Sequence, residues 1–520
     1  MTMQKKNTRR FCWYHLLFIV AILFTCVVSY FVTRDCIDSD ASSELILAEH
    51  LSKTGGILSA DWCYSTEIRV LNTQLVYTPL FLLFNSWHLV RYFGALILQG
   101  ILVLAIYLFT RLLKMEKKVF FITAAFSLLP LSVCYGRIVL YHCYYVPHIA
   151  LSLIMTGLVF GTYTVKWKRI VALSLLSLLS FAGGLGGIRQ LMITHAPLLL
   201  AVLCLCFLTK HSTGRHLHLF FMATISAAFS TVGFLVNKFY LAQLYTFQDK
   251  SENVIHLLDA DYFSNVAYGF FHHFGFRDEV DLISVAGIFG VLGLFLGLGC
   301  IGIACYYLWR YRRTGDLQQT IPYVMFLAYV VVMLFVFWIT GDVYRYVLYW
   351  TPVTAWMLPV FVLQLGKVSK PCSPLQIRKI LPYGIVLVLV CNGLMNATFL
   401  LNTNYFTQKY EGLGFQEKDW KAQMTPVVSF LQGNGYTLGY ATFWNCNIIT
   451  EVTDGEIRMI YTSLTENTDW LTLKSNRSLT NQQEFLLLQR SEVSAYTHRY
   501  DLTDDAIVYQ DEVFVVYGLE

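Results

Sequence analysis

Charged residues are scarce in this chain of 520 residues, because only 14% are Asp, Glu, Lys or Arg while 56% are hydrophobic. Soluble globular chains carry about 25% charged residues, so a soluble protein is excluded. Proline and cysteine are also few, with 11 and 13 residues, which excludes collagenous, disordered and disulfide-scaffold classes. The net charge of +5 is small, and we expect no nucleic-acid partner. The composition predicts a membrane protein.

Several catalytic motifs are also missing. The sequence has no P-loop, no GxSxG, no HExxH and no dinucleotide-binding fingerprint. ATP-driven transport and redox chemistry with a soluble cofactor therefore have no support. His272 and His273, with Asp259 and Asp261, are candidate ligands of a divalent metal, but their spacing fits no metal motif. We favour a loop without metal, and a divalent metal cofactor stays open as the alternative.

Long uncharged stretches dominate the first 400 residues. Eleven of them are long enough to cross a hydrocarbon core of about 30 Å. They cover residues 11–32, 92–109, 119–136, 138–165, 170–188, 190–209, 217–237, 282–309, 317–341, 346–366 and 380–401. The first is too long for a signal-peptide core and no small-residue cleavage site follows it, which predicts an uncleaved anchor. The fold class expected is mostly α, a polytopic membrane bundle of about 11 transmembrane helices.

The charges between these stretches predict the orientation of the chain. With the N-terminus in the cytoplasm, the short inner segments hold 20 basic residues and only two acids, Glu116 and Asp316. Basic residues gather on the cytoplasmic side of membrane proteins. We therefore expect a multi-pass protein of the plasma membrane with a cytoplasmic N-terminus. An odd number of spans then places the C-terminus on the extracytoplasmic side.

The last part of the chain changes character. Residues 402–520 carry 8 basic and 16 acidic residues, which predicts a small soluble α/β domain outside the membrane, following a transmembrane domain over 1–401. Two long outer loops, 33–91 and 238–281, belong to the transmembrane domain. The elements expected in the soluble domain are a helix over 420–431, a strand over 437–444, a hairpin over Asp454 and Gly455, a helix over 481–490 and a hairpin over 506–518.

The first outer loop opens with the densest acid cluster before the tail. Asp35, Asp38, Asp40 and Glu44 lie within a dozen residues of the first span. Asp40 and Glu44 are four residues apart, so a helix here would place both carboxylates on one face. A carboxylate at the membrane surface can accept the proton of an acceptor hydroxyl. The alternative is that Asp38 or Asp40 only caps a helix that runs to about Ser52.

This organisation resembles the GT-C glycosyltransferases, in particular the members that use polyprenyl-phosphate sugars, such as protein mannosyltransferases and lipid A aminoarabinose transferases. The shared features are an uncleaved first span, a long outer loop that opens with acids, and many spans joined by short inner loops. The resemblance implies that Asp40 or Asp38 is the catalytic acidic residue. Those members often have adjacent Asp and Glu, whereas this chain has Asp38-Ser39-Asp40, so the choice between the two stays open.

Four arginines near the outer ends of spans are candidate ligands of the donor phosphate, because a guanidinium pairs two phosphate oxygens. They are Arg69, Arg137, Arg189 and Arg345. Structural alternatives are a pair between Arg69 and Glu67, a pair between Arg345 and Asp342, and interfacial positions for the others. A polar and aromatic patch that contains His142 and Tyr145 would contact the sugar, although an aromatic belt explains the tyrosines equally well.

The sequence therefore predicts an inverting glycosyltransferase that moves a sugar from a polyprenyl-phosphate donor to a hydroxyl or amine. The acceptor would be a lipid, glycan or protein on the extracytoplasmic face, and membrane lipids would surround the bundle. The expected substrate-binding residues are Glu44, Glu67, His142 and Tyr145. The rival interpretation is a flippase or transporter of a lipid-linked sugar, without covalent chemistry. Transporters place ionisable residues near mid-membrane, whereas here the acids gather at the outer surface.

Overall fold

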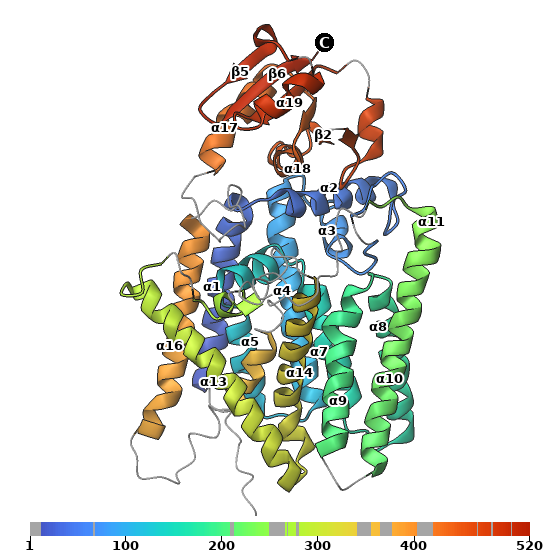
Figure 1. The fold of residues 1–520 in the computed structure, drawn as a ribbon, viewed down its shortest axis with the longest axis vertical. Helices are drawn as coiled ribbons and strands as arrows, with labels where there is room; N and C mark the ends of the chain where they lie inside the picture. Colours follow the sequence, from blue (N-terminus) through green and yellow to red (C-terminus); the bar gives the residue numbers. More distant parts are fainter. Residues whose placement is uncertain are drawn as a thin grey trace, which may run out of the picture.

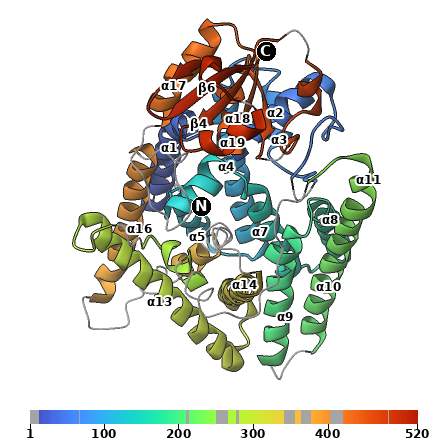
Figure 2. The same ribbon diagram turned by 45° about the horizontal axis from the view of Figure 1, so that its top comes forward.

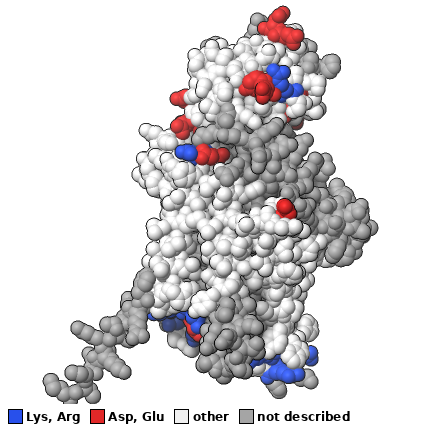
Figure 3. Space-filling view, turned by 90° about the vertical axis from the view of Figure 1, so that its left-hand side faces the viewer, with Lys and Arg blue, Asp and Glu red and all other residues white. Residues whose placement is uncertain are grey.

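The computed structural model describes residues 12–65, 68–208, 213–248, 266–267, 269–276, 280–340, 355–363, 377–402, 420–464, 466–479, 482–500 and 502–519. It contains a bundle of long helices with a small sheet domain at one end (Figure 1). On the face shown in Figure 3, Lys and Arg side chains gather at the end of the bundle away from the sheet domain. The same face shows few charged side chains along the middle of the bundle.

Eight of the described helices are long and apolar enough to cross a membrane. They are formed mainly by α1 (Trp13–Asp35), α4 (Trp87–Leu112), α8 (Lys166–Gly184), α9 (Ala196–Leu208), α10 (Thr213–Val236), α13 (Val285–Thr314), α14 (Leu317–Thr340) and α16 (Ile377–Asn402). A helix satisfies its backbone hydrogen bonds internally, which lipid demands because it offers none. The chain is an integral membrane protein, as its composition predicts.

The first span, α1, has one face exposed and the opposite face packed against the bundle. The exposed stripe of α1 is fully apolar and faces away from the protein, with Leu16, Val20, Leu23 and Val27 more than half exposed. The opposite face buries smaller side chains, including Thr25, whose hydroxyl donates to the Leu128 carbonyl at 2.6 Å. Lipid is the solvent for the exposed stripe, so both faces can be apolar.

Eight or nine of the eleven predicted spans are found among the described residues. The predicted span 119–136 is wrong as one helix, because α5 (Lys117–Ser127) has only 11 residues. The predicted span 138–165 is a bent arrangement. There, α6 (Val133–Tyr135) and the π-helix η1 (Gly136–Tyr141) meet α7 (Val146–Phe160) at 86°. Counting that pair as one span gives up to nine among the described residues, and of the predicted span 346–366 only 355–363 is described.

The break before α7 brings polar side chains to the outer end of the bundle. Residues 142–145 connect η1 to α7, and Cys143 has a φ of +61°. Non-helical backbone at a membrane edge is tolerated when protein buries it. His142 is 1% exposed and Tyr145 is 5% exposed, so this connection is buried. The bend therefore directs polar groups inward below the outer surface.

The first outer loop forms a helix that lies across the top of the bundle. This helix, α2 (Ser39–Thr54), follows α1 after a turn of three residues and runs crosswise to it (Figure 1). The short helix α3 (Gln74–Leu80) lies below it. Leu45, Ala48 and Leu51 are buried, because α2 is covered from below by the bundle and from above by the sheet domain. The helix that carries the acid cluster is therefore fixed from two sides.

The C-terminal domain contains a six-stranded sheet with the order β3-β2-β1-β4-β6-β5. Its strands are β1 (Leu438–Ala441), β2 (Arg458–Thr462), β3 (Asn467–Thr468), β4 (Glu484–Gln489), β5 (Ile507–Gln510) and β6 (Phe514–Leu519). Its helices are α17 (Trp420–Gly433), α18 (Phe443–Val452) and α19 (Val493–Tyr500). Strand β1 pairs in parallel with β2 and β4. Helix α18 contacts α2 and lies above it in Figure 1 and beside it in Figure 2.

Three of the five elements predicted for this domain are confirmed: the helix that starts at Trp420, the strand from residue 437, which is β1, and the hairpin of β5 and β6. The hairpin over Asp454 and Gly455 is wrong, because parallel β1 and β2 need a crossover, which α18 provides. The helix expected over 481–490 is the central strand β4. Four consecutive buried residues, Phe485 to Leu488, suit a strand covered on both faces as well as a helix.

Candidate functional site

Asp38 begins α2 as its N-cap. Its Oδ1 accepts a hydrogen bond from the backbone N–H of Ala41 at 2.8 Å, and the side chain is buried. An N-cap carboxylate satisfies one of the unpaired amides of the first turn and interacts favourably with the helix dipole. The capping interpretation of the acid cluster therefore applies to Asp38.

The same carboxylate is also the centre of a buried polar network. Arg137 donates from Nη2 to Oδ2, and the Nδ1 of His142 lies 3.4 Å from the same oxygen. Tyr144 donates its hydroxyl to Oδ1 at 3.0 Å. Burial disfavours the ionised form, but His142 and Arg137 outweigh it and hold the pKa of Asp38 well below its usual range. Asp38 is therefore a fixed, ionised carboxylate with both oxygens engaged.

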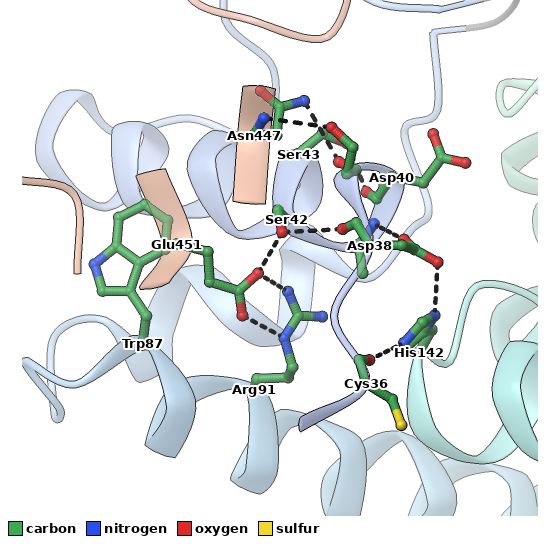
Figure 4. A network of polar contacts seen from close by, with 12 residues as sticks. Cys36, Asp38, Asp40, Ser42, Ser43, Trp87, Arg91, His142, Asn447 and Glu451 are labelled. Carbon is green, nitrogen blue, oxygen red and sulfur yellow. Dashed lines mark hydrogen bonds and ion pairs between the residues drawn. The ribbon is translucent and has the colours of Figure 1, made fainter. Parts of the chain in front are cut away.

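His142 is held in place from its other side. Its Nε2 lies 2.8 Å from the backbone carbonyl of Cys36, which can only accept, so Nε2 carries the proton (Figure 4). His142 and Arg137 both come from the bent segment before α7. The turn between α1 and α2 is thus attached to that segment. Arg137 and His142, which were predicted to contact the donor, are therefore buried against Asp38.

Asp40, one residue further into α2 than Ser39, has different surroundings. Its half-buried carboxylate makes no hydrogen bond or ion pair with the described part of the chain, and Figure 4 shows it turned away from the Asp38 network. Burial, together with the charge of Asp38, raises the pKa of Asp40 to about 6, although Arg69 and Arg137 act in the opposite direction. An available carboxylate with a pKa near neutrality is suited to general-base catalysis.

Glu44 lies one turn further along α2, as the spacing predicts. Its Oε1 accepts from the Asn72 amide at 3.1 Å and lies 3.8 Å from Nη1 of Arg69. Burial raises the pKa of Glu44 to about 7, against the opposing charge of Arg69. The other oxygen, Oε2, is buried without a partner, as are Thr73 Oγ1 and Tyr77 OH. Buried polar atoms normally have partners, so these three atoms are unusual among the buried groups of the described residues.

Two partly exposed cations lie in the same region. Arg69 is 26% exposed, and its charge acts on Asp40, on Glu44 and on His148 of α7. Arg189 is also half-buried, with its Cζ 5.7 Å from the centre of the Tyr145 ring, and its charge also reaches His148. The structure therefore brings Arg69, Arg189 and Tyr145 into one region beside the acids. Arg137, by contrast, is buried against Asp38.

Some predicted residues fall outside the part of the chain that the structure describes. These are Glu67, Arg345 with its neighbour Asp342, and the possible metal ligands Asp259 and Asp261. Among the described residues, no group of three or more His, Cys, Asp and Glu side chains is placed to hold a metal ion. The predictions for Glu67 and Arg345 stay predictions.

A buried ion pair that was not predicted from the sequence lies beside the site. Arg91 in the first turns of α4 pairs with Glu451 of α18, and the two side chains are 1% and 3% exposed. Arg91 stands directly before the uncharged run that starts at residue 92. A cation at the edge of a span is usually paired, so this position could have indicated an ion pair. Nothing in the local sequence identifies its partner, which lies 360 residues away.

An acid-bearing helix after the first span, a bent helix pair beneath it and a sheet domain at the same end of the bundle make up a fold that is also found among solved structures. Among solved structures, the chain is similar to ArnT from Cupriavidus metallidurans in the apo state, with a TM-score of 0.54 and 11% identity over 96% of this chain and 97% of that chain. The structure of ArnT bound to undecaprenyl phosphate gives a TM-score of 0.52, with the same identity and coverage. No family model and no curated protein matches the sequence. The resemblance seen in the sequence is confirmed for the fold.

Proposed function

We propose that this protein is a membrane glycosyltransferase that uses a polyprenyl-phosphate sugar donor on the extracytoplasmic face of the plasma membrane. The observation that carries the proposal is the contrast between two neighbouring carboxylates on α2. Asp38 is fully engaged, whereas Asp40 is unengaged and close to the partly exposed Arg69. The GT-C-like fold adds support, and a solved ArnT structure holds undecaprenyl phosphate.

Asp40 is the general base in the proposed reaction. It accepts the proton of the acceptor hydroxyl or amine, and the acceptor atom forms a bond to the anomeric carbon. The bond from that carbon to the phosphate oxygen breaks, and its electron pair leaves with the polyprenyl phosphate. Because one displacement occurs without a covalent enzyme intermediate, the anomeric configuration inverts. Asp38 stays ionised throughout, because its charge is needed beside Arg137 and His142.

Arg69 and Arg189 stabilise the departing phosphate in this mechanism. Both are partly exposed, and guanidinium groups recognise phosphate through paired hydrogen bonds. Their positive charge takes over the role of a proton donor to the leaving group. Arg137 contributes through Asp38, and Glu67 and Arg345 are further candidates outside the described residues.

The substrate sugar and the acceptor occupy the region next to α2. Glu44 Oε2, Thr73 Oγ1 and Tyr77 OH offer unpartnered polar atoms that sugar hydroxyls or an acceptor amine would satisfy. Tyr145 is buried with Arg189 against its ring, so in this proposal it holds Arg189 in place and does not itself stack on the sugar. His142 supports this region by fixing the Asp38 turn.

The orientation proposed is a cytoplasmic N-terminus and an extracytoplasmic sheet domain. The gathering of Lys and Arg at the end of the bundle away from the sheet domain supports it (Figure 3). The acids of α2 then face the compartment in which a lipid-linked donor and its acceptor meet.

Transfer of labelled sugar in proteoliposomes tests the proposal, using a panel of polyprenyl-phosphate donors. The wild-type protein is expected to transfer sugar, and Asp40→Asn is expected to lose about 10² to 10⁴-fold in rate while still binding polyprenyl phosphate. Asp505→Asn, an exposed carboxylate in the sheet domain, is the matched control. A wild-type protein that moves the lipid between leaflets without transfer, and an Asp40→Asn variant that moves it equally well, would instead establish a flippase.

A further inference from the structure

One face of α18 in the outer sheet domain holds the first turns of α2. Phe443, Asn447 and Glu451 are four residues apart in succession and therefore share one side of α18. They contact Ser39, which lies between Asp38 and Asp40, and Ser42, two residues after Asp40. Figure 4 shows the contact between Glu451 and Ser42. The domain that looks separate in sequence is thus joined to the helix that carries Asp40.

Ser39 lies between Asp38 and Asp40 and makes most of its contacts with the outer domain. Its hydroxyl donates to the Phe443 carbonyl, and the backbone N–H of Asn447 donates to the same hydroxyl at 3.3 Å. The Asn447 amide also donates to the Ser39 carbonyl at 3.4 Å. These bonds fix the backbone immediately before Asp40.

Glu451 fixes the next turn of α2 and joins it to the membrane bundle. Arg91 of α4 donates from Nε to its Oε1 at 2.6 Å and from Nη2 to its Oε2, which makes a two-bond pair. Ser42 donates its hydroxyl to the same Oε2 at 2.6 Å. All three side chains are buried. Because the planar guanidinium fixes the carboxylate, the position of Ser42 is fixed as well.

We propose that Glu451 is a positioning residue of the transferase, which sets the rotation of α2 through Ser42 and so aims the Asp40 carboxylate at the acceptor. This inference rests on the proposed function. A helix that turned about its own axis would move Asp40 while leaving α2 folded. A misplacement of about 1 Å can cost on the order of 10²-fold in rate. The outer sheet domain is therefore part of the catalytic apparatus and not only a cover for it.

Other contacts keep the domain docked when Glu451 is changed. The Asp454 carboxylate accepts from the backbone N–H of Trp87 at 2.8 Å, and Arg458 lies 3.3 Å from Glu49. The backbone of Cys63 bonds to the Thr472 carbonyl at 3.2 Å. These contacts do not involve Ser42 or Glu451. Substitutions of Ser42 or Glu451 should therefore change the orientation of Asp40 while the sheet domain stays docked on the bundle.

The sharpest test removes the anchor on α2 and leaves the ion pair intact. Ser42→Ala is expected to lower kcat for sugar transfer about tenfold, with the KM for the donor within about twofold of wild type. Ser52→Ala is the matched control, because its hydroxyl bonds only to the Glu49 carbonyl within α2. Wild-type kcat in both Ser42→Ala and Glu451→Gln, with both variants folded, would overturn the inference.

A second pair of variants separates positioning from stability. Arg91→Met combined with Glu451→Met removes both buried charges, so no unpaired charge is left to unfold the protein. If the pair only stabilised the fold, this folded double variant would transfer sugar at the wild-type rate. We expect kcat to stay about tenfold low, because Ser42 then keeps only its bond to the Asp38 carbonyl within α2 and has lost its anchor on α18. Recovery of the wild-type kcat in the double variant would overturn the inference.

Hydrogen exchange gives a readout that does not depend on transfer. We expect faster exchange in peptides from the first turns of α2, residues 39–45, in both Ser42→Ala and Glu451→Gln. If exchange rises but the wild-type protein transfers no sugar from any donor, the proposed function fails while the anchoring of α2 stands. If exchange in 39–45 is unchanged in both variants, the positioning inference fails whatever the transfer assay shows.

Discussion

The Arg137 guanidinium donates to the carboxylate of Asp38 across 99 residues of sequence, and both side chains are buried. This contact ties the turn after the first span to the bent segment before α7. It also engages the neighbouring acid that would compete with Asp40 for the proposed role of general base. The different surroundings of Asp38 and Asp40 therefore depend on the position of Arg137.

Loss of the Asp38 charge should cost stability, whereas loss of the Asp40 charge should not. Asp38→Asn leaves Arg137 buried beside a neutral group, and breaking a buried ion pair costs about 3–5 kcal/mol. Asp40 has no such partner, so Asp40→Asn should change the free energy of unfolding by less than about 1 kcal/mol. Thermal unfolding of both variants in the same detergent measures the difference. Equal losses in the two variants would contradict the roles assigned here.

The rate of transfer should rise with pH through about 6, because the base acts in its ionised form and burial raises the pKa of Asp40 to about 6. The charge of Arg69 opposes this rise, so Arg69→Met should move the acid limb of kcat/KM to higher pH. Lys53→Met, which removes an exposed cation of α2 paired with Glu49, is the control. An acid limb that moves to lower pH in Arg69→Met would exclude Asp40 as its source.

Binding of the leaving group should depend on two arginines. Arg69→Met and Arg189→Met are each expected to weaken binding of polyprenyl phosphate about tenfold to a hundredfold, because hydrogen bonds to charged groups contribute roughly 1.5–3 kcal/mol. Arg34→Met provides the control, since this cation is paired with Asp35 at the end of α1. Native mass spectrometry with graded lipid measures the affinity. Unchanged binding in both variants would place the phosphate elsewhere.

The turn after α18 should tolerate no side chain at Gly455. Its φ is +82°, and an added Cβ would lie 2.9 Å from Cζ2 of the Trp87 ring. Gly455→Ala should therefore lower stability by about 1–3 kcal/mol. Gly433→Ala at the end of α17 is the control, because an added Cβ there meets nothing within 4 Å. A Gly455→Ala variant with the wild-type Tm would show that the turn can shift away from Trp87.

The local sequence was a good guide to some parts of the site and a poor one to others. Asp40 and Glu44 were placed on one face of a helix by their spacing, and the structure confirms that helix. The choice between Asp38 and Asp40 could not be made from spacing, because both residues suit a helix start. It depends on Arg137, His142 and Tyr144, which arrive from a different segment.

The sheet domain shows the same limit. The apolar run of β4 is compatible with either a buried strand or a helix, and only its two strand neighbours make it a strand. The link between β1 and β2 was expected to be a hairpin. The local sequence does not show whether two successive strands pair in parallel or antiparallel. Pairing between distant strands is a property of the assembled sheet.

The sequence by itself determined that this is an integral membrane protein with an acid-bearing outer loop, because hydropathy and charge are local properties that lipid and water read directly. Tertiary structure alone decided that Asp38 is engaged, that Asp40 is available and that Glu451 reaches Arg91 across 360 residues. The physical reason is that buried charges must find partners, and which partners are within reach depends on how the helices pack.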